Sequence, residues 1–236
     1  MKEEIKQEIR AAADARFAKG RVTLILYFLL IVVASLAPLG FSALVGGTLG
    51  RINHFFASLV STSAHALISM FLVYPLLVGF KRGIMDLRTQ DNIKGCIFYA
   101  FDSSKYMNIV RGLSLYAVIG IVPDVLGIVD SLIPFINLSF VSTVTTFGMV
   151  FVNAFLLTFV EQIVADNNEI SPSDACLKSI SLMTGRKMEL LDLFLSYFVL
   201  ILIVIVTCGI AGIYVAPLIN CAVTCYYERI KEEYYV

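Results

Sequence analysis

Six long apolar runs, separated by short polar segments, make up most of this chain. They lie at about 22–40, 57–80, 109–128, 141–164, 190–208 and 211–227. Each run is near the roughly 20 residues that an α-helix needs to cross a hydrocarbon core about 30 Å thick. The pattern therefore predicts an all-α polytopic membrane protein with six transmembrane helices, in a single integral membrane domain over residues 1–236.

The connection between the last two runs can take two forms. Only residues 207–212 separate them, so two spans require a tight turn there. The alternative is one long bent helix over 190–227, which would move the C-terminus to the outside. The positive-inside rule disfavours this alternative, because Arg229 and Lys231 would then be external.

Basic residues fix the expected orientation of the runs. Of the 18 Lys and Arg residues, all except Arg51 lie before the first run, between the second run and the first residues of the third, between the fourth and fifth, or after the last. Short cytoplasmic loops retain such residues, so both termini are expected in the cytoplasm. The composition agrees, with 58% hydrophobic residues and a mean hydropathy of +0.85. Because 18 acidic residues balance the basic ones, no nucleic-acid partner is expected.

Three candidate interfacial amphipathic helices precede the outward runs on the cytoplasmic side. Their apolar stripes consist of Ile5, Ile9, Ala12, Ala13 and Phe17, then Ile93, Cys96, Ile97, Ala100 and Phe101, and finally Cys176, Leu177, Ile180 and Met183. Each stripe precedes one hairpin of apolar runs, which suggests three repeat units over 1–80, 81–164 and 165–236. The alternative is that any array of hairpins entering from the inside has this appearance.

The third interfacial helix has the clearest local signals. Ser171 is the expected N-cap, Pro172 suits the first helical position, and Gly185 suits the position after the helix ends. The basic residues in and after this helix are candidates for binding the membrane surface or a protein partner: Lys178, Arg186 and Lys187. The alternative is that they form a solvated inner face.

A combination of residues in the second half of the chain carries a family resemblance. It comprises Val164-Ala165-Asp166-Asn167-Asn168, Ser171 to Ala175, Ser179, Ser181-Leu182-Met183-Thr184-Gly185-Arg186-Lys187, Leu190 to Tyr197, Gly209, Gly212, Pro217 and Tyr226-Tyr227-Glu228-Arg229. Over about 160–230 the chain resembles the bacterial integral membrane family called domain of unknown function 975. The resemblance implies a six-helix fold in a bacterial plasma membrane, distantly similar to the membrane domains attached to some glycerophosphodiester phosphodiesterases. It supplies no established catalytic residues.

Two ionisable residues inside the apolar runs are candidates for function, since such groups are costly at membrane depth. Glu161 lies near the inner end of the fourth run, where a buried carboxylate could take part in proton coupling. The alternative is that it reaches the inner headgroups. His65 lies in a Ser-rich part of the second run and could bind a ligand or relay protons. Its alternative role is a hydrogen bond between packed helices.

Two amides, Asn153 and Asn220, are polar candidates of the same intramembrane kind. Pro75 and Pro217 are expected to kink their helices and to free backbone carbonyls for polar partners.

No motif indicates catalysis or a cofactor. The chain has no zinc-protease, nucleophile-elbow or phosphate-loop motif, so it is not expected to be an enzyme. The five cysteines do not suggest a disulfide framework. Cys221 and Cys225 are four residues apart but lack His or acidic companions at ligand spacing, so no metal is expected.

Two functional classes fit these observations. The first is a non-enzymatic interaction, regulatory or lipid-organising membrane factor with lipids and a cytoplasmic protein as partners. It is favoured by short outer loops and a polar inner face. The alternative is a carrier of a lipid or other hydrophobic small molecule through the helical bundle, favoured by the two prolines and the Ser-rich stripe around His65.

Overall fold

The computed structural model describes residues 3–48, 54–89, 94–132 and 139–234. Within these ranges, all of the regular secondary structure is helical. The predicted all-α class is confirmed.

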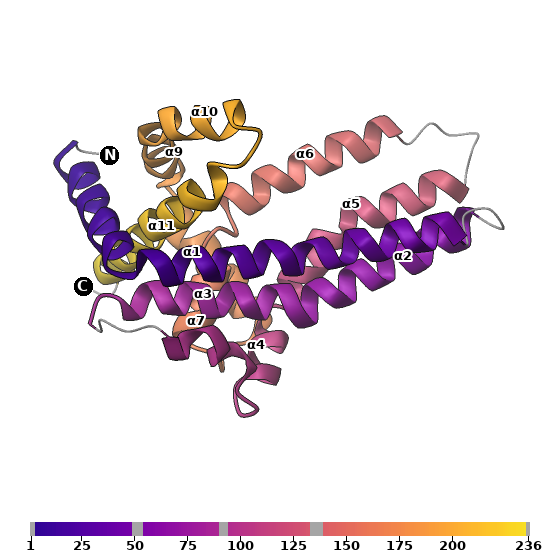
Figure 1. Ribbon diagram of the computed structural model, residues 1–236, viewed down its shortest axis with the longest axis horizontal. Helices are drawn as coiled ribbons and strands as arrows, with labels where there is room; N and C mark the ends of the chain where they lie inside the picture. Colours follow the sequence, from indigo (N-terminus) through magenta and orange to yellow (C-terminus); the bar gives the residue numbers. More distant parts are fainter. Residues whose placement is uncertain (1–2, 49–53, 90–93, 133–138, 235–236) are drawn as a thin grey trace.

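The first third of the chain forms one helical hairpin (Figure 1). It contains α1 (Glu3–Thr48), α2 (His54–Ile68), the short π-helix η1 (Ser69–Val73) and α3 (Tyr74–Asp86). No residue interrupts the helix between α2 and α3, so the returning arm is continuous from Phe56 to Asp86. The π-helix ends two residues before Pro75, whose missing N–H disturbs the regular hydrogen-bond ladder.

The second third forms another hairpin, made of more pieces. The 3₁₀-helix η2 (Lys94–Phe101) leads to α4 (Tyr106–Gly112) and α5 (Ser114–Leu132), and the chain returns through α6 (Ser139–Phe155) and α7 (Val160–Asp166). In Figure 1, α5 and α6 extend away from the chain ends, as do α1 and α2.

The last third contains α8 (Pro172–Met183), α9 (Lys187–Ser196), α10 (Phe198–Val206) and α11 (Gly212–Tyr234). Helices α9 and α10 are bent by 57° at Tyr197. After α10 the chain reverses through a turn in which Cys208 and Gly209 have positive φ angles. Residues 190–227 therefore form two helical arms joined by a turn, and not one bent helix.

Two helical segments, Glu3–Val45 and Phe56–Asp86, are long and apolar enough to cross a membrane, and the bent pair α9–α10 would make a third. The expected six spans are not confirmed. One reason is that Leu113 divides the third predicted run between α4 and α5, and residues 156–159 divide the fourth between α6 and α7. The three-unit repeat is likewise unconfirmed.

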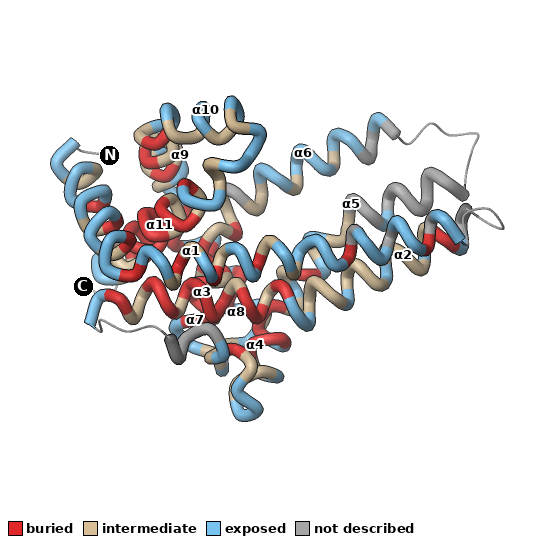
Figure 2. Tube along the Cα trace, in the orientation of Figure 1, coloured by how far each residue is buried: buried red, intermediate tan, exposed pale blue. Residues whose placement is uncertain are grey.

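The buried residues gather toward the end of the molecule that carries the two chain termini, where α1, α3, α7, α8 and α11 meet (Figure 2). Tyr27, Phe80, Phe159, Tyr226 and Tyr227 are among the largest fully buried side chains in this core. The extended hairpins expose many large apolar side chains instead, for example Leu26, Val33, Phe147 and Phe151. An apolar surface of this extent is typical of contact with lipid or another protein.

The first predicted amphipathic helix is the beginning of α1. Its stripe faces protein: Ile9, Ala13 and Phe17 are buried, and Ile5 and Ala12 pack against the same core. The partner of this part of the chain is chiefly α11. In the second stripe, Ile93 lies outside the described residues, and Ala100 is buried in η2, which is a 3₁₀-helix.

The third predicted amphipathic helix is α8, and its local signals are confirmed. The Ser171 hydroxyl accepts a hydrogen bond from the Asp174 backbone N–H at 3.1 Å, Pro172 begins the helix, and Gly185 has a φ of 80°. The predicted stripe, however, does not form one buried face. Cys176 and Met183 are buried, whereas Leu177 is 63% and Ile180 37% exposed.

Candidate functional site: a buried charge cluster beside an ionic network

Three polar side chains from α3, α7 and α11 meet inside the core. The Lys81 ammonium donates a hydrogen bond to Asn220 Oδ1 and lies 3.8 Å from Glu161 Oε2. Asn220 Nδ2 donates to the Ala216 carbonyl at 2.9 Å, which orients its oxygen acceptor. The side chains of Lys81 and Glu161 are only 7% and 15% exposed, so their charges are largely removed from solvent.

Lys81 is the member of this cluster that the sequence reasoning missed. As the first base after the second apolar run, it was assigned to the polar segment that follows the run. Its spacing along the helix could have indicated this position. Lys81 lies three residues after Val78 and three before Ile84, and both of these side chains are fully buried. Lys81 therefore lies on the inward face of α3.

The break between α6 and α7 places Glu161 in the first turn of α7. Ser179 from α8 holds this break open, since its hydroxyl donates to the Leu156 carbonyl at 2.7 Å and accepts from the Phe159 N–H at 3.2 Å. Ser179 is fully buried, so both backbone groups would otherwise lack a partner away from water. A negative side chain is also favourable near a helix N-terminus.

The cluster is a buried ion pair of opposite charges with an amide as third member. Burying an ammonium is costly unless a counter-charge and hydrogen-bond acceptors accompany it, and Glu161 and Asn220 supply these. Two neighbouring polar side chains, Gln162 and Thr224, are also fully buried. Neither has a hydrogen-bond partner within the part of the chain that the structure describes.

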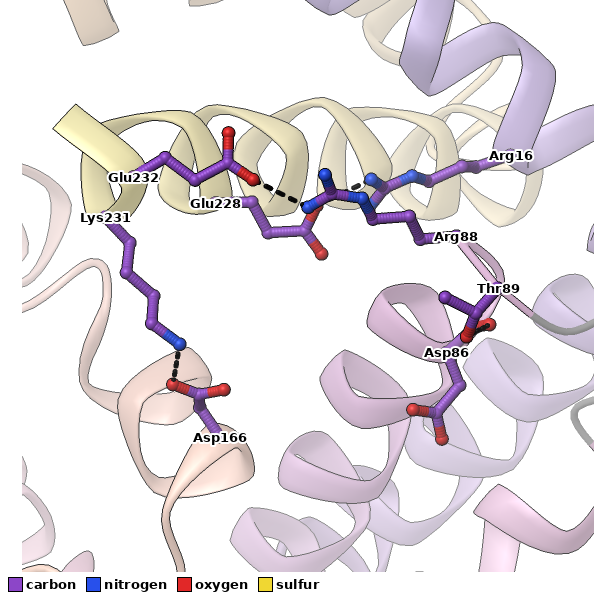
Figure 3. Close-up of polar contacts among 8 residues, drawn as sticks. All are labelled: Arg16, Asp86, Arg88, Thr89, Asp166, Glu228, Lys231 and Glu232. Carbon is purple, nitrogen blue, oxygen red and sulfur yellow. Dashed lines mark hydrogen bonds and ion pairs between the residues drawn. The ribbon is translucent and has the colours of Figure 1, made fainter. Parts of the chain in front are cut away.

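An ionic network surrounds the C-terminal end of α11, and Figure 3 shows the part of it that contains Arg16, Arg88 and Lys231. Its ion pairs include Arg16–Glu228 at 2.5 Å, Arg229–Glu8 at 2.6 Å, Arg88–Glu232 at 2.8 Å, Arg186–Glu233 at 2.7 Å, and Lys231–Asp166. The partners come from α1, the end of α3, α7 and the start of α9. The closing residues of the chain therefore join elements that are far apart in sequence.

Hydrogen bonds to carboxylates favour the charged form of two arginines in this network. The hydrogen bond to Glu232 raises the pKa of Arg88, and the one to Glu8 raises the pKa of Arg229. Hydrogen bonds between a guanidinium group and a carboxylate are stronger than those between neutral groups.

Two cavities open within this network. One of about 420 Å³ lies between α1 and α11 and is lined by Arg16, Arg88 and Glu228 among others. The second, of about 410 Å³, is lined by Arg82 and Asp86 of α3, Asp166 of α7, and Tyr227 and Lys231 of α11, together with neighbouring side chains. These are the three helices that carry the buried cluster. Lys81, Glu161 and Asn220 all precede the cavity-lining residues in their helices.

The other predicted intramembrane candidates lie apart from this cluster. His65 lines a cavity of about 40 Å³ with Ser69 and Tyr74. Asn153 has a buried Oδ1 atom without a partner among the described residues.

The three basic candidates differ in their surroundings. Arg186 forms the ion pair with Glu233, Lys178 is half-buried, and Lys187 is exposed at the start of α9. Only Arg186 thus belongs to the ionic network described above.

The expectation that Pro75 frees a backbone carbonyl for a polar partner is met. Pro75 cannot donate to the carbonyl of Phe71, four residues earlier, and that carbonyl accepts a hydrogen bond from the Tyr106 hydroxyl at 2.7 Å. This contact joins α4 to η1.

The chain is similar to a known protein family over part of its length. No curated protein and no solved structure matches the chain. The region that matches a family model is residues 129–234. It contains Glu161, Ser179, Asn220 and the α11 part of the ionic network, whereas Lys81 and Arg16 precede it. The resemblance predicted from the sequence is confirmed over residues 129–234, where the chain matches the family described as "Protein of unknown function (DUF975)".

Proposed function

We propose that this chain is a multi-pass protein of the bacterial plasma membrane that acts as a non-enzymatic interaction or lipid-organising factor through its polar end. The observation that carries this proposal is the division of the molecule into two parts. Ion pairs and two cavities of about 400 Å³ occupy the end near the termini, while the extended hairpins expose apolar side chains. Such hairpins suit a lipid environment, and the polar end suits the cytoplasm.

Helix α8 is the proposed contact surface for the inner leaflet. Leu177 and Ile180 project from the protein, and Lys178 lies between them in sequence. Apolar side chains inserted at the headgroup boundary, with bases beside them, bind membranes that contain anionic lipid. Lys187, exposed at the start of α9, would add to this attraction.

The second candidate function is a carrier of a lipid or other hydrophobic small molecule. The two cavities at the polar end have volumes in the range of about 300–1,000 Å³ that small-molecule sites occupy. The Ser-rich stripe supports this function less well, since the cavity beside His65 holds only about 40 Å³. We therefore favour the interaction or lipid-organising function.

Spin labels on α8 in the reconstituted protein test the proposed contact. Leu177 and Ile180 are exposed on the protein itself, so labels there should become accessible to oxygen, which partitions into lipid, only if α8 meets the bilayer. A label at Ser181, which is exposed on the same helix, should report water and serves as the matched control. Equal aqueous accessibility at all three positions would contradict the proposal.

Reporter fusions test the orientation. Reporters that are active only in the cytoplasm should be active after Asp91, Glu169 and Glu233, and silent after Gly47 and Ser131. An inactive fusion at Glu233 would place the C-terminus outside and remove the polar end from the cytoplasm.

A further inference from the structure

Helix α10 is an apolar arm whose surface stays largely uncovered within the described part of the chain. All 9 of its residues are apolar, and none of them is buried. Val199 near its start is 68% exposed, and Val206 at its end is 81% exposed. The uncharged character continues into α11, because residues 198–227 contain no Asp, Glu, Lys, Arg or His. Such a surface calls for a covering that is itself apolar.

Contacts of α9 fix the start of this arm at the polar end of the molecule. The Asp192 carboxylate pairs with the Lys6 ammonium at 3.2 Å. The Arg10 guanidinium lies over the Tyr197 ring, 5.2 Å from its centroid. Tyrosine is enriched where a membrane meets water, and the 57° bend between α9 and α10 occurs at this residue. Tyr197 therefore marks the place where the arm leaves polar surroundings.

The arm is too short to cross a bilayer. At 1.5 Å per residue, its 9 residues rise about 14 Å, which is about half of the roughly 30 Å hydrocarbon core. In Figure 1 the turn after α10 points in the same direction as the α1–α2 and α5–α6 hairpins but ends well before them. In a bilayer that these hairpins cross, the turn therefore lies within the hydrocarbon core.

The turn between α10 and α11 supplies acceptors for its own backbone donors. Every backbone N–H from Thr207 to Val215 donates to an oxygen of residues 203–211, at distances from 2.8 to 3.3 Å. The first four N–H groups of a helix have no partner within that helix and often bond to water. In α11 the preceding turn bonds all four, so this helix end does not depend on solvent.

The side chains of the turn show the same adaptation. The Thr207 hydroxyl donates to the Ile203 carbonyl at 2.8 Å and accepts from the Ala211 N–H at 3.1 Å. Beside it, Val206 and Ile210 project apolar side chains outward, and Ile210 is 74% exposed. In hydrocarbon no water can replace a missing hydrogen-bond partner, so backbone and hydroxyl groups must be paired internally. The turn meets this requirement for its N–H groups and its hydroxyl.

We propose that α10 and the start of α11 form a re-entrant hairpin, which enters the membrane from the polar end, turns back inside the hydrocarbon core, and contacts lipid acyl chains there. Lys187, exposed at the start of α9, suits the anionic headgroups at the point of entry. The C-terminus stays on the side where Arg229 and Lys231 are expected. This inference rests on the proposed membrane location and adds the depth of one segment.

Depth-dependent fluorescence quenching tests the inference. The chain contains no tryptophan, so a single introduced indole reports its own depth. Val206→Trp and Ile210→Trp place one on each side of the turn, at exposed positions that tolerate a larger side chain. Each full-length variant is reconstituted in phosphatidylcholine vesicles with lipid brominated either close to the headgroup or close to the chain ends. Both variants should lose more fluorescence to the bromines close to the chain ends.

Leu44→Trp is the matched control, because Leu44 is 68% exposed near the far end of α1. It lies 22 residues after Val22, or about 33 Å along the helix, so it should reach the opposite headgroups. Its fluorescence should be quenched more by bromines close to the headgroup. Circular dichroism checks the fold of each variant, and either folded turn variant is sufficient for the test.

Two results would overturn the re-entrant hairpin alone. Stronger quenching of a turn variant by bromines close to the headgroup would show that the arm crosses the bilayer or lies along its surface. A turn variant that brominated lipid does not quench, beside a quenched Leu44→Trp, would show that protein or water covers the turn. If brominated lipid quenches none of the three variants, the membrane location fails, and the proposed function fails with it.

The native Cys208 thiol gives a second measurement in the same turn. Cys208 is exposed on the protein itself, and detergent micelles admit water and reagent to the protein surface more freely than a bilayer does. In a Cys96→Ser background, a charged maleimide should therefore label Cys208 much more slowly in sealed vesicles than in micelles. Equal labelling rates in the two media would place the turn in water and overturn the inference.

Discussion

Replacing Lys81 by methionine should destabilise the protein by more than the loss of an ordinary surface charge. Methionine keeps nearly the length and the helix propensity of lysine, so α3 itself is little affected. What disappears is the counter-charge of Glu161, 3.8 Å away, and the donor to Asn220.

The size of the effect follows from burial. The Glu161 side chain is only 15% exposed, so its carboxylate cannot regain full hydration when the ammonium is removed. Breaking a buried pair by deleting one partner costs about 3–5 kcal/mol. Replacing both partners by neutral residues removes the stranded charge, and so Lys81→Met/Glu161→Gln should be more stable than Lys81→Met alone.

Reversible unfolding in mixed detergent micelles, followed by circular dichroism, measures these differences. The matched control is Lys105→Met, because Lys105 pairs with Asp102 in an exposed position, where a pair contributes about 0–1 kcal/mol. The reasoning fails if Lys81→Met costs no more than Lys105→Met. It also fails if the double variant is less stable than both single variants.

Further predictions concern the ionic network, the helix break and the cysteines. In a double-mutant cycle, Arg16→Ala and Glu228→Ala should show a coupling of about 1–3 kcal/mol, since the pair is mostly buried; additive effects would show that it does not join α1 to α11. Ser179→Ala should cost about 1–3 kcal/mol because it strands two backbone groups, whereas Ser179→Thr should keep the hydrogen bonds; equal stability of the alanine variant and wild type in the same unfolding assay would contradict this. In a Cys96→Ser background, maleimide should label the exposed Cys208 well before Cys176, because burial both shields the Cys176 thiol and raises its pKa; equal labelling rates by mass spectrometry would refute this.

The local pattern of the sequence was sufficient to predict the helical class and several helix ends. Ser171, Pro172 and Gly185 mark the bounds of α8 because capping and positive φ depend on residues adjacent in the chain. The short turn after α10 was likewise visible, since two glycines lie close to the end of an apolar run. The family resemblance rested on such local motifs as well.

The direction in which each helical face points was decided by tertiary packing. The stripe of Ile9, Ala13 and Phe17 was expected at a membrane surface, but it packs against the protein core. Leu177 and Ile180 were placed on one face with Cys176, yet they project outward. Helical spacing shows which residues share a face. It does not show whether lipid or another part of the protein covers that face.

The charge cluster shows most clearly what only the tertiary structure decides. The sequence identified Glu161 and Asn220 as unusual polar residues inside apolar runs, because each contrasts with its own neighbours. It did not identify Lys81 as their partner, since the three residues belong to helices widely separated in the chain and contact one another only when α3, α7 and α11 pack together. A residue's polarity is a local property that the sequence displays. The counter-charge that makes its burial tolerable is a property of the assembled core.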